Sequence, residues 1–340
     1  MARTKNETDS SPSNKAVTLV EAIRQGIWEE MERDASVFVI GEDVGAYGGA
    51  FKVSEGFIEH FGAERVVDTP ISEAAIVGAA CGAALLGMKP VAEFQFIDFI
   101  SCGFDMLTNY AAKSRYRNCG AIAAVFRGPC GGGVRGGPFH SLNAESFFLN
   151  TAGLKMVEPA TAYDAKGLIK AAIRDPDPVI FFEHKKLYRL PRLREELPAA
   201  DYIVEIGKAR TIREGRDLSI ITFGAMTLNA LDAAETLAKE DNLQVEVIDL
   251  RTLAPLDKTA ILETVKKTNR VMILHEASLT GGIGGEIAAI IAEEAFEWLD
   301  APPVRIASID TPVPFAPQME DYYLPSLNEI IQAARKLAAY

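Results

Sequence analysis

The run DTPISEAAIVGAACGAALLG, from Asp68 to Gly87, places a single carboxylate, that of Glu73, at the start of a stretch of small apolar residues. Ser72 and Glu73 suit the first turn of a helix. The alanines and glycines that follow let another backbone approach closely, as at a subunit interface or over a bound cofactor. The carboxylate either binds a partner outside the helix or only complements the helix dipole, and this segment alone favours the dipole.

A second candidate for chemistry is the glycine-rich loop from Gly128 to Ser141, GPCGGGVRGGPFHS. It carries Arg135 in its middle and His140 near its end. Such a loop can adopt many backbone shapes and can close over a substrate, although it can equally be a structural surface loop. Because ordering a glycine-rich loop costs entropy, a histidine held at its end is a better candidate acid or base than most histidines.

Other motifs argue against common nucleotide and metal sites. GGIGGE, residues 281–286, has Ile287 where GxGxxG requires glycine, so only an anion site at a helix N-terminus remains open. No GxxxxGK[ST] sequence occurs. His60 and His184 have no ligand-spaced acid or cysteine that would indicate zinc, so we interpret both as structural or surface residues. DPDP, residues 175–178, is interpreted as a turn, whose carbonyls can bind a monovalent cation.

The composition favours a soluble intracellular protein. The length of 340 residues suggests about two domains, and the net charge of -12 argues against a general affinity for nucleic acid or anionic membrane. Residues 1–15 are polar, so we expect a mobile tail and no secretory signal. The apolar runs are too short to span a bilayer. The cysteines are expected to be reduced thiols: Cys81, Cys102, Cys119 and Cys130.

Apolar strands alternate with helices along the chain, which predicts an α/β fold of parallel sheets covered on both faces. Between Lys185 and Tyr202 the pattern breaks into charges and prolines, and the domain boundary is placed there. Strands are expected at 37–43, 65–68, 91–96, 121–127, 155–158, 179–183, 218–223, 245–249, 270–275 and 304–308. Helices are expected at 19–31, 54–61, 72–86, 99–116, 162–173, 226–239, 258–267 and 284–299.

Charged residues gather at the expected strand ends. In open parallel sheets, ligands collect beyond the carboxyl ends of the strands. The residues at or just after such ends are Glu42, Asp43, Asp68, Arg127, His275 and Glu276.

A series of motifs along the chain resembles a known family. The motifs are IGEDVG (40–45), DTPISE (68–73), AEFQFIDF (92–99), FRGP (126–129), FHS (139–141) and FFEHKKLYR (181–189), followed by VIDLRTLAPLD, LHEASLTGG and DTPVPFA. In this order, from Val17 to Tyr340, they resemble the beta subunit of thiamine-diphosphate-dependent 2-oxo acid dehydrogenases, a family with pyruvate, branched-chain and acetoin enzymes. The resemblance implies a pyrimidine-binding domain (16–190), a linker (191–204) and a transketolase C-terminal-like domain (205–340).

The resemblance also implies roles for individual residues. It gives Glu73 a partner, the aminopyrimidine ring of thiamine diphosphate. A hydrogen bond from this ring to the carboxylate favours the imino tautomer, whose nitrogen can then take the proton from the thiazolium carbon. Phe99 matches the aromatic residue that stacks on the pyrimidine. His140 matches the active-site histidine that orients the substrate or intermediate and assists acyl transfer to lipoamide. Carbonyls fall where some members bind potassium at Ile122, Ala124, Ala172, Asp175 and Asp177.

The resemblance implies partners as well. The chain has no GDG with a downstream asparagine, the pattern that holds magnesium and the diphosphate in this superfamily. An alpha subunit is therefore expected to supply them, in an assembly of two alpha and two beta chains, and the C-terminal domain is expected to help dock this assembly to a lipoyl acyltransferase core. Many members read HSQ where this chain has His140, Ser141 and Leu142, so that glutamine's polar contact is not expected.

The expected function is oxidative decarboxylation of a small 2-oxo acid. FFEHKKLYR and LHEASLTGG look closer to branched-chain members, so a branched-chain substrate ranks first, with pyruvate or acetoin next. A transketolase-like ketol transferase is the alternative within the superfamily. A non-catalytic scaffold is the alternative outside it, but a scaffold has no reason to keep Glu73, Phe99 and His140 together. The expected location is the bacterial cytoplasm, or an organelle matrix after processing.

Overall fold

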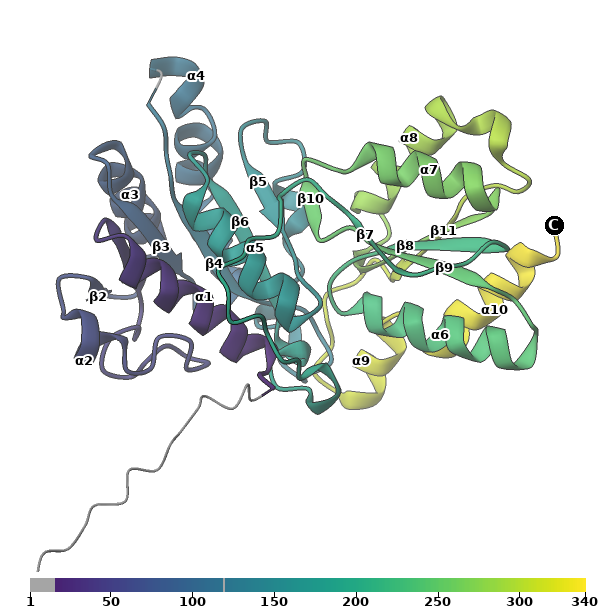
Figure 1. The fold of residues 1–340 in the computed structure, drawn as a ribbon, viewed down its shortest axis with the longest axis horizontal. Helices are drawn as coiled ribbons and strands as arrows, with labels where there is room; N and C mark the ends of the chain where they lie inside the picture. The colour runs from purple at the N-terminus through teal and green to yellow at the C-terminus, as the bar shows by residue number, and fades with distance from the viewer. Residues whose placement is uncertain (1–15, 119) are drawn as a thin grey trace, which may run out of the picture.

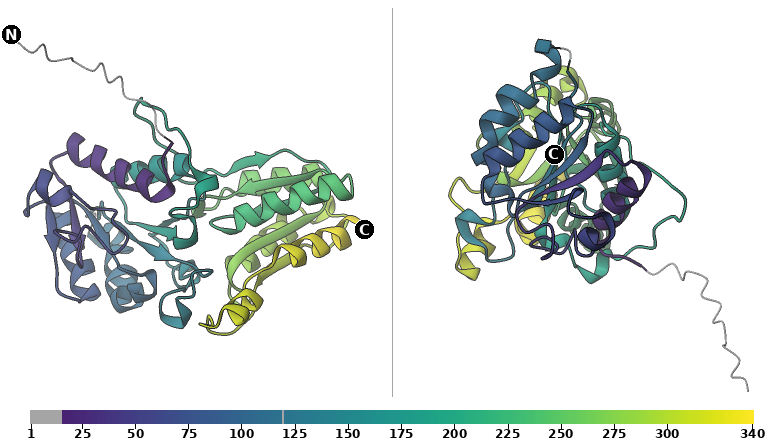
Figure 2. Two further views of the ribbon diagram at one scale, coloured as in Figure 1. Left: turned by 90° about the horizontal axis from the view of Figure 1, so that it is seen from below. Right: turned by 90° about the vertical axis from the view of Figure 1, so that its left-hand side faces the viewer.

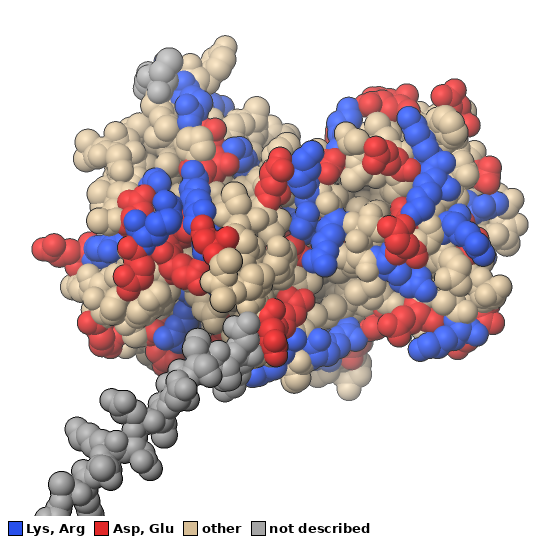
Figure 3. All heavy atoms as spheres, viewed as in Figure 1, with Lys and Arg blue, Asp and Glu red and all other residues tan. Residues whose placement is uncertain are grey.

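The computed structural model describes residues 16–118 and 120–340, so the expected tail and Cys119 lie outside the described residues. The chain forms two α/β units, each built around its own mainly parallel sheet (Figure 1), as the sequence predicts. Within the described residues, no helix has the length and apolar character needed to cross a membrane. On the face seen in Figure 3, acidic and basic side chains are interspersed.

The first unit is built on a seven-stranded sheet in the order β10-β5-β6-β4-β3-β1-β2. All its neighbouring strands are parallel except β10, which runs antiparallel to β5. The strands are β1 (Val37–Gly41), β2 (Val66–Asp68), β3 (Lys89–Glu93), β4 (Val125–Cys130), β5 (Lys155–Val157), β6 (Val179–His184) and β10 (Thr252–Ala254). The α-helices are α1 (Leu19–Arg33), α2 (Phe57–Phe61), α3 (Glu73–Leu85), α4 (Ser114–Asn118) and α5 (Ala162–Arg174).

The second unit is built on a five-stranded sheet in the order β12-β11-β8-β9-β7, with β7 antiparallel at one edge. Helices α7 and α8 cover one face, and α6 and α10 cover the other (Figures 1 and 2). The strands are β7 (Arg210–Arg213), β8 (Leu218–Thr222), β9 (Val245–Asp249), β11 (Val271–Ser278) and β12 (Val304–Ser308). The helices are α6 (Met226–Glu240), α7 (Lys258–Thr268), α8 (Ile283–Glu294), α9 (Pro317–Tyr323) and α10 (Leu327–Ala338).

Local sequence explains where several helices begin and how closely they pack. Thr18 caps α1 in a capping box with Glu21, and Asp257 caps α7 by accepting a hydrogen bond from the Ala260 N–H at 3.1 Å. Helix α1 packs on α5 at Gly26, where an added Cβ would lie only 2.4 Å from Cγ2 of Ile169. Glycine at this position therefore lets the two helices approach each other.

The single helix expected at 99–116 is wrong. The structure has a 3-10 helix η1 (Ile97–Gly103), a π-helical segment η2 (Met106–Ala111) and the short helix α4. At Gly103 an added Cβ would lie 2.8 Å from Cγ2 of Val77, so the backbone is pressed against α3 there. Thr108 donates a hydrogen bond to the Phe104 carbonyl at 2.9 Å, a contact that bends helices. Both contacts depend on the packing of the segment, which apolar periodicity does not reveal.

The glycine-rich loop begins later than the sequence suggests. Strand β4 continues to Cys130 because Gly128 and Pro129 pair with Phe182 and Glu183 of β6. The loop that leads to His140 therefore starts at residue 131.

The two units are joined by more than a linker. Strand β10 comes from the second half of the chain but completes the first sheet, with Thr252 opposite Val157. The side chain of Arg251, just before β10, donates to Asp164 at the start of α5 with a distance of 2.8 Å. Both apolar cores also contain buried residues from each half of the chain. The second unit is thus in a position to hold parts of the first.

Candidate functional site

Glu73 is the first residue of α3, which follows β2 and a short loop. Its side chain is half-buried, and no hydrogen bond or ion pair joins the carboxylate to another residue in the described part of the chain. Ser72, the residue before the helix, does not cap it through its side chain. The Glu73 carboxylate is therefore free to accept a hydrogen bond from a ligand.

A second carboxylate, that of Glu42, is close enough to Glu73 to interact with it electrostatically. Glu42 directly follows β1, is buried, and has an Oε1 atom with no hydrogen-bond partner among the described residues. Burial raises the pKa of Glu42, and the charges of Glu73 and Asp43 raise it further. The raised pKa means that Glu42 takes up a proton more readily than an ordinary glutamate does.

The structure brings Phe99 and His140 together. Their ring centroids lie 5.8 Å apart at 87°, and the Phe96 ring lies 4.5 Å from the His140 ring at 90°. The imidazole is therefore packed against two aromatic rings that lie perpendicular to it. Helix η1, which carries Phe99, ends against the first turn of α3, since an added Cβ on Gly103 would lie 3.6 Å from the Glu73 carbonyl oxygen. The elements that carry all three expected residues are thus neighbours.

Asp98 anchors the segment that follows His140. Its Oδ1 atom accepts hydrogen bonds from the N–H groups of Ser141 at 3.2 Å and Leu142 at 3.0 Å. Asp98 is buried, and this burial raises the pKa of its carboxyl group. Because Phe99 is the next residue, one short segment provides both an aromatic ring beside His140 and the acceptor that fixes the backbone directly after His140.

Glu276, at the end of β11, holds the glycine-rich loop from the second unit. Its carboxylate accepts hydrogen bonds from the Gly132 N–H at 2.7 Å and the Asn143 side chain at 2.9 Å, and contacts the His184 ring at 2.9 Å. Burial alone would raise the pKa of Glu276, but the histidine contact and the donated hydrogen bonds lower it to about 2. His184 is buried, as its structural interpretation requires.

Glu320, in α9, holds the same loop at the next residue. The buried carboxylate accepts a hydrogen bond from the Gly133 N–H at 2.9 Å and one from the Arg135 guanidinium at 2.7 Å. Arg135 also pairs with the exposed carboxylate of Asp321. Two carboxylates of the second unit therefore fix the loop that ends in His140.

The other charged residues expected at strand ends stabilise the fold. Arg127 is buried in β4, and its guanidinium pairs with Glu93 of β3 and Glu183 of β6. The Asp68 carboxylate accepts a hydrogen bond from the Gly45 N–H at 2.6 Å. Both contacts bind charged side chains to groups within the protein, so Arg127 and Asp68 hold neighbouring elements together.

The glycines of GGIGGE make room for a histidine. An added Cβ would lie 2.5 Å from the His275 ring at Gly282 and 2.8 Å from it at Gly284. Burial lowers the pKa of His275 to about 4, so the imidazole is neutral near pH 7. Close packing against this ring explains why residues 282 and 284 are glycines. The anion site at the start of α8 stays a prediction.

The carbonyls expected to bind potassium lie around the end of α5 and the start of β4. Backbone hydrogen bonds already engage three of them, those of Ile122, Ala124 and Ala172. Among the described residues, no group of three or more His, Cys, Asp and Glu side chains is arranged to hold a metal ion. That search concerns side chains, so a carbonyl site for potassium stays a prediction.

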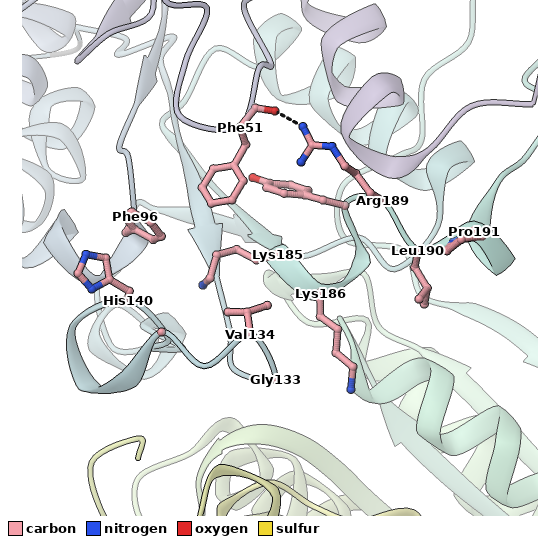
Figure 4. Close-up of a pocket in the computed structure, with 12 residues that line it drawn as sticks. Phe51, Phe96, Gly133, Val134, His140, Lys185, Lys186, Arg189, Leu190 and Pro191 are labelled. Atoms are coloured by element: carbon pink, nitrogen blue, oxygen red, sulfur yellow. Dashed lines mark hydrogen bonds between the residues drawn. The ribbon is translucent and has the colours of Figure 1, made fainter. Parts of the chain in front are cut away.

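A cavity of about 680 Å³ opens beside His140 (Figure 4). It lies between the glycine-rich loop and the segment after β6, and both Phe96 and His140 line it. Sequence reasoning did not identify this cavity, nor the roles of Asp98 and Glu320. The position of Asp98 next to Phe99 in the motif AEFQFIDF could have indicated its role. The sequence around Glu320 contains no comparable indication.

Domain comparisons agree with this architecture. Residues 15–191 match the transketolase pyrimidine-binding domain family, and residues 207–330 match the transketolase C-terminal domain family. A solved chain titled "split gene transketolase, inactive beta4 tetramer" matches with a TM-score of 0.78 and 21% identity, over 95% of this chain and 99% of that one. The fold and the site therefore define a two-domain protein of the transketolase type.

Curated relatives define the family more closely. The chain is 49% identical to the 2-oxoisovalerate dehydrogenase subunit beta of Bacillus subtilis, over 95% of this chain and 99% of the relative. It is 44% identical to the pyruvate dehydrogenase E1 component subunit beta of Staphylococcus aureus (94% and 98%) and to the mitochondrial beta-2 subunit of Oryza sativa (96% and 87%). The chain belongs to the family of E1 beta subunits of 2-oxo acid dehydrogenases.

Proposed function

We propose that this chain and an alpha subunit together catalyse the oxidative decarboxylation of a branched-chain 2-oxo acid, with acyl transfer to a lipoyl group. The observation that carries the proposal is the placement of Glu73 and the Phe99–His140 pair on neighbouring elements. The 2-oxoisovalerate dehydrogenase relative is 49% identical and the pyruvate dehydrogenase relatives 44%. This difference supports a branched-chain substrate, with pyruvate as the second candidate.

The residues present fit thiamine diphosphate, the cofactor of this family. Glu73 offers a carboxylate without a partner among the described residues, as required for a hydrogen bond with a ring nitrogen. Phe99 offers a half-buried ring that can stack on a pyrimidine. When bound, thiamine diphosphate supplies the carbon nucleophile and the electron sink for decarboxylation. The part of Glu73 is to hold a proton on the ring nitrogen that its carboxylate contacts.

His140 is proposed to orient the substrate. The rings of Phe96 and Phe99 lie perpendicular to the imidazole and restrict its orientation, and Asp98 fixes the backbone that follows. A ring held in this way can donate a hydrogen bond to a substrate oxygen without losing further rotational freedom. Its second proposed part is to assist transfer of the acyl group to lipoamide.

An alpha subunit is proposed to complete the site. Small residues are exposed on α3 beside Glu73, among them Ala75, Ala79 and Gly82, and they permit close approach of another chain. The partner would hold magnesium and the diphosphate group in an assembly of two alpha and two beta chains. The C-terminal domain is proposed to help dock this assembly to a lipoyl acyltransferase core, and the carbonyls near Asp175 and Asp177 are proposed to bind potassium.

The test is 2-oxo-acid-dependent reduction of an artificial electron acceptor by the complex of this chain with its alpha subunit. Reduction should require thiamine diphosphate and magnesium and should be faster with 2-oxoisovalerate than with pyruvate. Turnover of sugar phosphates without a lipoyl acceptor would instead identify a ketol transferase. An assembled complex that binds cofactor and turns over none of these substrates would indicate a scaffold.

A further inference from the structure

The cavity beside His140 has an apolar wall. Side chains of Phe51, Phe96, Val134 and Leu190 line it, and Figure 4 shows Phe96 beside His140 and Leu190 on the opposite side. A volume of about 680 Å³ lies within the usual range for small-molecule sites. The wall suits an aliphatic or aromatic group, and His140 stands at one end.

The charged residues that line this cavity are all basic. They are Lys185, Lys186 and Arg189, and none of the lining residues is acidic. In a chain with a net charge of -12, this concentration of positive charge is a local exception. The cavity therefore favours an anion with an apolar body over a neutral or cationic ligand.

Among the three cations, Lys185 differs from its neighbours. The Arg189 guanidinium donates to the Phe51 carbonyl at 2.8 Å, and Lys186 is exposed to solvent. Lys185 is only 7% exposed, and its Nζ atom has no hydrogen-bond partner among the described residues. Its Nζ lies 5.8 Å from the centroid of the Phe96 ring, which itself packs on His140.

An ammonium group in this situation costs free energy until an anion reaches it. Burial lowers the pKa of Lys185, while the charges of Cys130, Asp98, Glu276 and Glu320 act in the opposite direction. None of these groups forms a hydrogen bond or ion pair with Nζ. A carboxylate that enters the cavity would supply the missing partner.

We propose that Lys185 binds the carboxylate of the 2-oxo acid, while the apolar wall of the cavity receives the side chain of the acid. This inference rests on the function proposed above, and it names the residue that recognises the anionic end of the substrate. Because Lys185 binds the substrate and does not take part in the chemical step, it contributes to the affinity of the enzyme for the 2-oxo acid.

Two inhibitors of the same shape, one anionic and one neutral, test this directly. We suggest 4-methylpentanoate and its neutral amide, 4-methylpentanamide, measured as inhibitors of 4-methyl-2-oxopentanoate oxidation by the assembled complex. In Lys185→Met the inhibition constant of the carboxylate should rise at least tenfold, while that of the amide should change less than twofold. Lys185→Arg should keep carboxylate affinity within about threefold. Lys52→Met, which removes a half-buried lysine outside the lining of this cavity, is the matched control.

Lys185→Met should assemble and melt at or above the wild-type temperature, because it removes an unpaired buried charge. An unchanged inhibition constant for the carboxylate, or an equal rise for carboxylate and amide, would overturn the inference. So would loss of assembly in Lys185→Met but not in Lys52→Met, which would place a partner-subunit carboxylate on Lys185. Absence of wild-type turnover would refute the proposed function itself, a separate result.

Discussion

The Glu320 carboxylate accepts a hydrogen bond from the Gly133 N–H at 2.9 Å, across 187 positions of sequence. Glu320 belongs to α9 of the second unit, and Gly133 belongs to the loop that ends in His140. The conformation of this loop therefore depends on the second unit as well as on its own sequence. Glu276 strengthens the same dependence one residue earlier, at Gly132.

Glu320→Gln should lower kcat at least tenfold. Glutamine keeps one acceptor oxygen, but its amide nitrogen cannot accept the second of the two hydrogen bonds that Gly133 and Arg135 donate to separate oxygens of Glu320, so the loop is held less firmly and His140 is oriented less well. Steady-state kinetics of the complex measures this effect. Asp321→Asn is the matched control, because it removes an exposed ion pair with the same arginine, which solvent screens, and should leave kcat within twofold.

Replacement of Asp98 should separate hydrogen bonding from charge. Asp98→Ala leaves the N–H groups of Ser141 and Leu142 without their acceptor, at a cost of about 1–3 kcal/mol, and should reduce both the melting temperature and kcat. Asp98→Asn keeps a carbonyl oxygen as acceptor and should retain activity within about threefold. Equal loss in both variants would indicate that the negative charge matters and would contradict a purely positioning role.

Glu73→Gln should abolish turnover, with a loss of at least about 100-fold in kcat, and should leave assembly unchanged. Glutamine preserves the size of the side chain but cannot favour the imino tautomer as a carboxylate does. Acceptor reduction and size-exclusion chromatography of the complex measure the two effects. Glu59→Gln, at an exposed position in α2, is the control, and retained turnover in Glu73→Gln would refute the catalytic assignment.

Asp249 should make the protein less stable as pH rises. Burial raises its pKa to about 8, the charge of Asp164 adds to this effect, and Arg251 opposes it. The folded state therefore keeps a proton that the unfolded chain releases near pH 4. The free energy of unfolding should fall by about 1.4 kcal/mol per pH unit between these two values.

Asp249→Asn stays neutral and should remove this contribution. As the pH rises from 5 to 8, the melting temperature of the variant should therefore increase relative to that of the wild type. Parallel melting profiles for the two proteins over this range would show that the pKa of Asp249 is not raised in the folded state.

Much of the fold could be predicted from the sequence, because its strands and helices carry apolar periodicity of their own. Strands β9 and β12 have the bounds that the sequence predicts. Strand β10 was missed, since three residues carry no period and its pairing partner lies about a hundred positions away. Helix α10 was also missed, although its apolar residues recur at helical spacing.

Part of the candidate site could also be predicted from the sequence, and part could not. Glu73, Phe99 and His140 stand in motifs, and the structure places their elements side by side, while their roles stay predictions. Lys185 also stands in a motif, but its burial and its missing partner follow from the packing of distant segments. Nothing in the sequence around Glu320 indicates its contact with the distant residue Gly133.

The pairing of β10 with β5 has a consequence for biosynthesis. Until residue 254 has left the ribosome, β5 exposes an unpaired edge at one end of the first sheet. A nascent chain that ends near residue 204 carries only part of each apolar core and a strand edge open to other nascent chains. The first unit is therefore completed only when most of the protein has been translated, which makes chaperone binding most valuable during the synthesis of residues 205–254.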